Sequence, residues 1–168
     1  NPPTVTLAVG NATVNENSGT TTVTATLNTV SGLAVTVTMT KTGTATETLD
    51  YTLAGTIMIP AGSLSGTTTL TAATDTLDET NEMVVIDITG VTNGTEAVPQ
   101  TATVTITDQT TPPTVTLTVA TLSLSEPAEA TVVTAGLSAV SALPVTVTLT
   151  KTGTATENSD YELAGTIN

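Results

Sequence analysis

Carboxylates are the side chains of this sequence that could do chemistry. The 168 residues contain 15 Asp and Glu against 2 Lys and Arg, which gives a formal net charge of −13 at pH 7. The two cations are Lys41 and Lys151. A chain of this charge repels nucleic-acid backbones and anionic membrane surfaces. We therefore expect its counter-charges to be metal cations or basic partners.

The remaining residue types exclude most catalytic chemistry. The sequence has no His and no Cys, which removes the usual general base, the commonest transition-metal ligand and any disulfide. It contains no glycine-rich phosphate loop and no serine in a nucleophile elbow. Asp78 and Glu79 are adjacent carboxylates, but neighbours in a loop do not form a catalytic pair. We predict that the chain is not an enzyme.

An alternation of apolar residues with Thr predicts the elements that position the carboxylates. Thr is β-branched and favours strands over helix, and 47 of the 168 residues are Thr. Alternation of this kind predicts about seven strands, at residues 4–9, 22–27, 35–40, 56–59, 67–72, 84–88 and 101–106. Short strands at regular spacing, with turn residues between them, are typical of an all-β antiparallel sandwich.

The sequence repeats itself at the length of a domain. Residues 2–7 return letter for letter as residues 112–117, and residues 35–57 return as 145–167 with four differences. Both matches are offset by 110 residues. We interpret residues 1–110 as one complete unit and residues 111–168 as the N-terminal half of a second unit. Repetition of this kind favours a scaffold, stalk or filament over an enzyme.

The second unit has no counterparts of residues 58–109. We interpret it as part of a longer array. The alternative is completion by strands from another chain, although the first unit has no spare strands to donate. Between the units, Pro112 and Pro113 predict a stiff, extended linker.

Two residue types recur at the same place in both units. Lys41 and Lys151 each end a predicted strand, where we expect them to extend to solvent or to pair with a nearby carboxylate. Tyr51 and Tyr161 are the only aromatic residues of the chain. We expect both to pack in a core that is otherwise aliphatic.

Four motifs occur in order along the first unit. They are the stretches at residues 43–51 (GTATETLDY), 55–62 (GTIMIPAG), 75–82 (DTLDETNE) and 103–108 (TVTITD). This order resembles the Calx-beta domain family, with its patterns G-T-A-T-x-x-x-D-Y, G-x-[LIV]-x-[FI]-x-x-G, D-x-x-x-E-x-x-E and V-T-I-x-D. The resemblance implies an immunoglobulin-like antiparallel sandwich of seven strands. The family includes the calcium sensors of sodium–calcium exchangers and large bacterial surface proteins.

The resemblance also implies a calcium site at one end of the sandwich. The matching positions are Glu16, Asp50, Asp75, Glu79, Glu82 and Asp108. Calcium takes about six to eight oxygen ligands, which clustered carboxylates can supply. In the second unit only Glu126 and Asp160 match, so that unit cannot form a complete site from this chain alone.

Departures from the family pattern weaken this prediction. Thr74 stands where calcium-binding members carry an Asp, and Gln109 and Thr110 follow Asp108. These changes imply fewer or weaker ions, or an acidic, solvated loop end that binds none and keeps the array soluble. Asp108 adjoins the linker, so an ion bound there would stiffen the joint between units.

We therefore expect an extracellular or cell-surface module with a structural or adhesive role in a tandem-repeat surface protein, sheath or filament. The expected partners are neighbouring copies of the repeat and a cell-surface or polysaccharide ligand. No apolar run reaches the roughly 20 residues that span a bilayer, so we expect no membrane insertion. One alternative is a calcium-sensing regulatory module. Another is a threonine-rich surface that binds ice or carries glycans, as the ladder of Thr36, Thr38 and Thr40 suggests.

Overall fold

The computed structural model describes residues 1–127 and 129–168 and contains strands and turns but no helix in that part of the chain. Accordingly, no described helix could cross a membrane. The chain forms two compact units. The first consists of Asn1–Thr76 and Thr80–Gln109, and the second consists of Thr110–Asn168 together with Leu77–Glu79.

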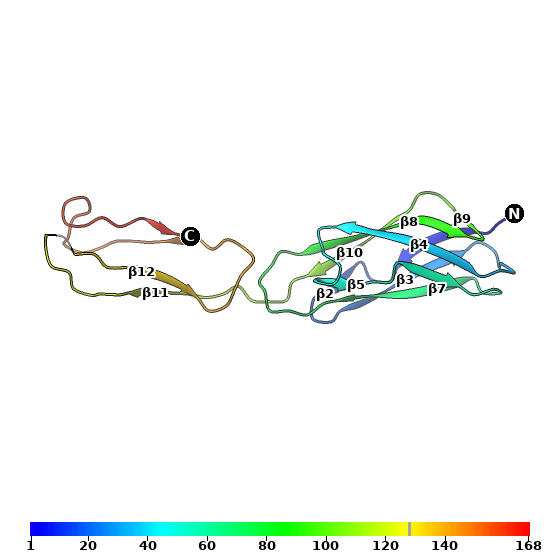
Figure 1. Ribbon diagram of the computed structural model, residues 1–168, viewed down its shortest axis with the longest axis horizontal. Helices are drawn as coiled ribbons and strands as arrows, with labels where there is room; N and C mark the ends of the chain where they lie inside the picture. Colours follow the sequence, from blue (N-terminus) through cyan, green and yellow to red (C-terminus); the bar gives the residue numbers. More distant parts are fainter. Residues whose placement is uncertain (128) are drawn as a thin grey trace. The chain divides into compact units, whose positions relative to one another are not determined.

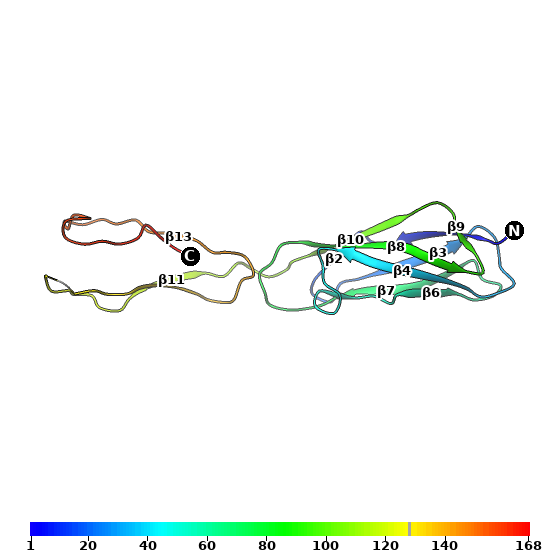
Figure 2. The same cartoon turned by 45° about the horizontal axis from the view of Figure 1, so that its top comes forward.

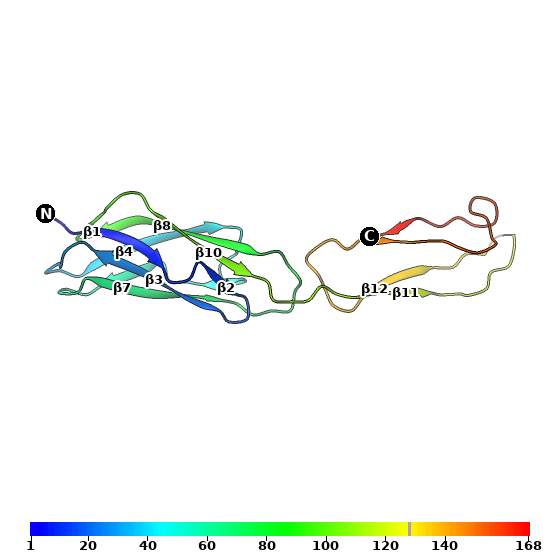
Figure 3. The same cartoon turned by 180° about the vertical axis from the view of Figure 1, so that it is seen from behind.

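The first unit is a sandwich of two five-stranded sheets (Figure 1). One sheet has the order β5 (Tyr51–Thr52), β7 (Ser65–Ala72), β3 (Thr20–Leu27), β1 (Thr4–Val9) and β9 (Thr95–Glu96). The other has the order β2 (Thr13–Asn15), β10 (Thr101–Thr107), β8 (Glu82–Thr92), β4 (Val35–Gly43) and β6 (Thr56–Ile59). Figure 2 shows β10, β8 and β4 side by side in the second sheet, and Figure 3 shows β1 and β3 neighbouring each other in the first.

This architecture confirms the predicted all-β sandwich. Each of the seven strands expected from the alternation falls within β1, β3, β4, β6, β7, β8 or β10. The neighbours in each sheet are antiparallel except for two pairs, β1 with β9 and β10 with β2. The strands β2, β5 and β9 contain only two or three residues each and were not predicted.

Apolar residues at alternate strand positions form the core between the sheets. Its largest fully buried side chains include Ile57, Ile59, Leu70 and Ile86. Tyr51 is 2% exposed and packs in the same cluster, as expected, whereas Tyr161 is half-buried and does not belong to this cluster. Because the sequence has no Phe or Trp, aliphatic side chains bury most of the apolar area that stabilises this unit.

Close backbone approach requires glycine where β4 ends. Gly43 has a φ of 126°, and a Cβ atom there would lie 2.1 Å from the carbonyl oxygen of Met83 in β8. A larger residue at this position would force the strands apart. Gly43 thus lets the chain leave β4 tightly and enter the loop that leads to β5.

The second unit contains two short ladders. β11 (Val115–Val119) pairs with β12 (Val133–Leu137), and β13 (Val147–Thr148) pairs with β14 (Thr166–Ile167). The registers repeat those of the first unit at an offset of 110, since Val115 lies opposite Leu137 as Val5 lies opposite Leu27. No described residue between Thr110 and Asn168 is buried.

Candidate metal centre

Three carboxylates converge at one end of the sandwich. One oxygen from each of Glu16, Asp75 and Glu79 lies within 4.8 Å of the others. Glu16 directly follows β2, and Asp75 and Glu79 belong to the segment between β7 and β8. Glu16 is buried, Glu79 is half-buried and Asp75 is exposed. The cluster therefore combines a buried carboxylate with an exposed one.

Parallel pairing of β2 with β10 explains the burial of Glu16. Thr107 of β10 lies opposite Asn15, and the amide of Glu16 donates to the carbonyl of Thr107 at 3.1 Å. The Gly19 amide closes the following turn by donating to the Asn15 carbonyl at 2.9 Å. This turn holds Glu16 beside Asp108, the residue that follows β10.

Thr74 connects the segment after β7 to the same turn. Its hydroxyl donates to the carbonyl oxygen of Glu16 at 3.3 Å and lies 2.9 Å from the hydroxyl of Ser18. At the end of β7, two residues earlier, the amide of Ala72 donates to the carbonyl of Gly19 at 2.8 Å. The Thr that replaces an expected Asp ligand therefore provides a hydrogen-bonded tie between the two chain segments that carry the cluster.

Burial, together with its acidic neighbours, raises the pKa of the Glu16 carboxyl to about 7. Burial is the largest cause, followed by the hydrogen bond with the Asp108 carboxyl and by the negative charges of Asp75 and Asp108. A backbone hydrogen bond from Gln109 acts in the opposite direction. Near neutral pH the Glu16 carboxyl is therefore partly protonated. A bound cation would replace that proton.

The donor set fits a hard cation. Every side chain in the cluster offers carboxylate oxygen, and no nitrogen or sulfur ligand is present. Calcium prefers such oxygens and tolerates irregular geometry. Glu16, Asp75 and Glu79 would hold the ion, with Asp108 next to Glu16.

Asp50 and Glu82 have other surroundings. The carboxylate of Asp50 accepts a hydrogen bond from the Thr46 amide at 2.5 Å and so caps its own turn. Its carbonyl accepts from the amide of Ala73 at 2.8 Å, which links this turn to the segment that carries Asp75. Glu82 is the first residue of β8 and lies opposite Ile106 of β10. Neither residue belongs to the group of three carboxylates.

Asn81 is a contributor that the sequence analysis did not single out. Its side-chain oxygen accepts a hydrogen bond from the amide of Asp108 at 3.2 Å. It therefore holds the end of β10 against the segment between β7 and β8. Asn81 sits inside the acidic motif at residues 75–82, and this position was the only signal that could have identified it.

The expected positions in the second unit do not form such a cluster. The carboxylate of Asp160 accepts from the Thr156 amide at 2.6 Å, as Asp50 does in the first unit. Glu126 lines an open cavity of about 540 Å³ together with Glu129 and Glu162. Within residues 1–127 and 129–168, the group around Glu16 is the only one of three or more potential metal ligands.

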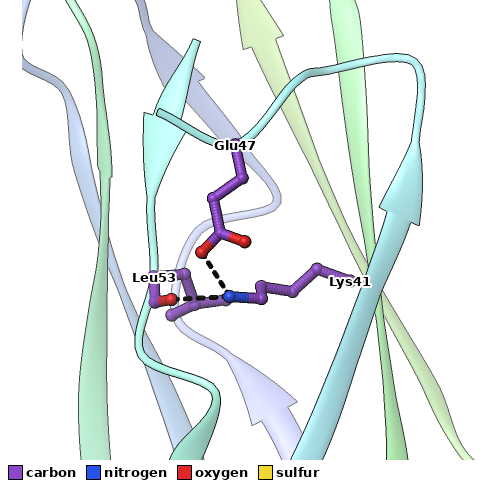
Figure 4. Close-up of polar contacts among 3 residues, drawn as sticks. All are labelled: Lys41, Glu47 and Leu53. Carbon is purple, nitrogen blue, oxygen red and sulfur yellow. Dashed lines mark hydrogen bonds and ion pairs between the residues drawn. The ribbon is translucent and has the colours of Figure 1, made fainter. Parts of the chain in front are cut away.

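A lysine fastens the loop that contains Asp50 (Figure 4). Lys41 forms an ion pair with Glu47, and its ammonium group also donates to the carbonyl of Leu53 at 2.9 Å. The second unit repeats the arrangement with Lys151, Glu157 and the carbonyl of Leu163. Both lysines thus pair with a carboxylate six residues later, in agreement with one of the two roles expected for them.

Comparison with known proteins gives the chain a family. The family model described as the Calx-beta domain matches residues 1–110 and again residues 108–166. A search of curated proteins found no match. Two of the similar solved structures are the calcium binding domain CBD12 of CALX1.1, at 26% identity and a TM-score of 0.52, and the apo-form Calx CBD1 domain, at 25% and 0.51.

Each of these two similarities covers 61% of this chain. The match spans 97% of the CBD1 structure but only 44% of the CBD12 structure, so less than half of the latter is represented. A third structure, CBD12 from CALX1.2, has 23% identity and a TM-score of 0.53 over 62% of this chain and 44% of its own length, and it supports the fold alone. On the family-model match and this shared fold, the chain belongs to the Calx-beta domain family.

Proposed function

We propose that the chain binds calcium through Glu16, Asp75 and Glu79, and that it serves as a structural module of an extracellular or cell-surface tandem-repeat protein. The observation that carries this proposal is the convergence of the three carboxylates within 4.8 Å, one of them buried. A buried carboxylate surrounded by negative charge is costly unless a proton or a cation compensates it.

The similar structures support calcium as the cation. One of them is a calcium binding domain by its description. This chain shares its fold and matches the Calx-beta family model. The chemistry of this chain agrees, since only oxygen ligands are available in the cluster.

The structural role would follow from what the ion connects. Glu16 belongs to the turn after β2, Asp75 and Glu79 to the segment after β7, and Asp108 to the end of β10. A cation held by these groups would tie three chain segments together. Asp108 is also the residue from which the linker at 108–113 departs, so calcium would stiffen the joint between repeats.

A structural rather than a catalytic role is supported by composition and repetition. The chain has no His or Cys, and its registers recur at an interval of 110 residues. Its partners would be neighbouring copies of the repeat. If the module is adhesive, it would also bind a cell-surface or polysaccharide ligand.

Isothermal calorimetry of the intact chain with calcium tests the proposal. We expect the wild type to bind calcium. The calcium affinity should fall about ten-fold or more in Glu16→Gln and in Asp75→Asn, because each substitution removes the charge of a ligand. Glu162→Gln is the matched control, since it removes the same charge from an exposed position of the second unit. Absence of binding in the wild type, or equal binding in all three variants, would contradict the assignment.

A calcium-sensing regulatory module is the second candidate, and the similarity to a calcium binding domain favours it. The two candidates differ in affinity. Sensor sites work at dissociation constants of about 10⁻⁷–10⁻⁵ M, whereas extracellular modules bind at about 10⁻⁴–10⁻³ M. The same calorimetric titration therefore separates them.

A further inference from the structure

The outer edge of β1 is covered by a strand over only part of its length. β1 runs from Thr4 to Val9 and pairs with β3 along one side. On its other side, which we call the β1 edge, the two-residue strand β9 pairs only with Thr4 and Val5. Among the described residues, the rest of β1 therefore has no hydrogen-bonded strand on this side.

The sequence of β1 favours pairing with a further strand. Its six residues, TVTLAV, include no charged side chain, no Pro and no Gly, and four of them are β-branched. Uncovered edges of this kind accept strands from other chains, and natural proteins block them. Near-identical units repeat such an edge along one chain, which raises the risk of wrong pairing between copies.

The side chain of Gln100 occupies the place of the absent strand. Its oxygen accepts a hydrogen bond from the amide of Leu7 at 3.0 Å, and its nitrogen donates to the carbonyl of Val5 at 3.2 Å. A paired strand would bond to the same kind of backbone groups. One side-chain amide therefore continues the ladder of β9 beyond its last residue pair.

The loop before β10 holds Gln100 in this position. The backbone amide of Gln100 donates to the carboxylate of Glu96 at 2.8 Å. The amide of Ala97 donates to the carbonyl of Val5 at 3.0 Å and so fixes the start of the loop to β1. Gln100 itself is half-buried and directly precedes β10. Because the loop is anchored at both ends, the side chain loses little freedom when it bonds to β1.

We propose that Gln100 blocks the β1 edge and thereby keeps the chain from pairing through this edge with a second copy of itself. Without the Gln100 side chain, the Leu7 amide and the strand up to Val9 are open to an antiparallel partner. The same segment of a second copy fits best. Two uncharged β1 strands meet without direct like-charge contacts, although each chain has a net charge of −13.

Hydrogen exchange and sedimentation of the intact 168-residue chain test the inference. In Gln100→Ala, exchange of the Leu7 amide at low protein concentration should rise about ten-fold or more, because the amide loses its acceptor. Sedimentation velocity should show a monomer for the wild type and a dimer that grows with concentration for the variant. Where the dimer forms, the amides of Leu7 and Val9 should become protected again.

Two further variants separate edge blocking from a general loss of stability. Gln100→Asn keeps the amide group on a side chain that is shorter by one methylene, so it should not reach both groups of β1. It should behave as Gln100→Ala does, and it carries the same two measurements if Gln100→Ala fails to fold. Asn28→Ala is the matched control, because Asn28 accepts a hydrogen bond from the Thr4 amide at 2.8 Å and so supports the same strand elsewhere. It should leave the Leu7 amide protected and the chain monomeric.

Three results would overturn the inference. Unchanged exchange of Leu7 in both Gln100 variants would show that Gln100 does not cover the β1 edge. Faster exchange without a dimer at millimolar protein concentration would show that Gln100 does not prevent association. Equal dimerisation of the wild type or of Asn28→Ala would show that the copies meet elsewhere.

Discussion

Glu16→Gln should remove most of the pH dependence of stability from the first unit. In the folded chain the Glu16 pKa lies near 7, against an ordinary value of 4.5. Because folding raises the pKa, the folded state holds the proton more tightly than the unfolded state does. The stability associated with this proton is fully present below about pH 4.5 and is lost as the pH rises through about 7.

The size of this loss follows from the shift in pKa. Each pKa unit corresponds to about 1.4 kcal/mol, so a shift from 4.5 to about 7 corresponds to about 3 kcal/mol. Urea unfolding with a calcium chelator measures this between pH 5 and pH 8. In a Tyr161→Phe background, the fluorescence of Tyr51 reports on the first unit alone.

We expect the free energy of unfolding of the first unit to fall by about 2.5 kcal/mol between pH 5 and pH 8 in the absence of calcium, because a small part of the full loss occurs below pH 5. Glu16→Gln should flatten this slope, because glutamine does not titrate. Saturating calcium should flatten it as well, since the ion replaces the proton. A stability that rises over this range, or a slope that Glu16→Gln leaves intact, would refute the burial and crowding assigned to Glu16.

Three further substitutions, the last with a matched control, test other parts of the first unit. Thr74→Asp should raise calcium affinity by adding a ligand and lower the stability of the calcium-free unit by adding repulsion, as calorimetry and urea unfolding would show together. Lys41→Met should cost about 1–2 kcal/mol of unfolding free energy, because Leu53 loses a hydrogen-bond donor and Glu47 its cation. Leu70→Ala should cost about 2–5 kcal/mol because Leu70 is fully buried, whereas Leu64→Ala should cost much less because Leu64 is 50% exposed.

The long strands could be predicted because their signal is local. In residues 35–40 every second side chain is apolar, and Val35, Val37 and Met39 are indeed buried. The strands β2, β5 and β9 are too short to show a period, and two of them depend on parallel pairing with distant strands. Their positions were therefore beyond pattern analysis.

The candidate site was predictable in composition but not in geometry. The family resemblance identified Glu16, Asp75 and Glu79, which the structure brings together. The resemblance could not show that Asp50 caps its own turn, because an Asp can either cap a backbone amide or bind a metal. Burial of Glu16 depends on the pairing of β2 with β10, two segments about 90 residues apart, and leaves no trace in the local sequence.

The most direct test of calcium binding is an NMR titration of the intact, isotope-labelled chain with calcium. The account predicts saturable shifts of the amides of Glu16, Asp75, Glu79 and Asp108, with the amides of residues 111–168 unchanged. Absence of shifts up to about 10 mM calcium, well above the range of extracellular modules, would contradict it. So would shifts centred on Glu126 and Asp160 instead.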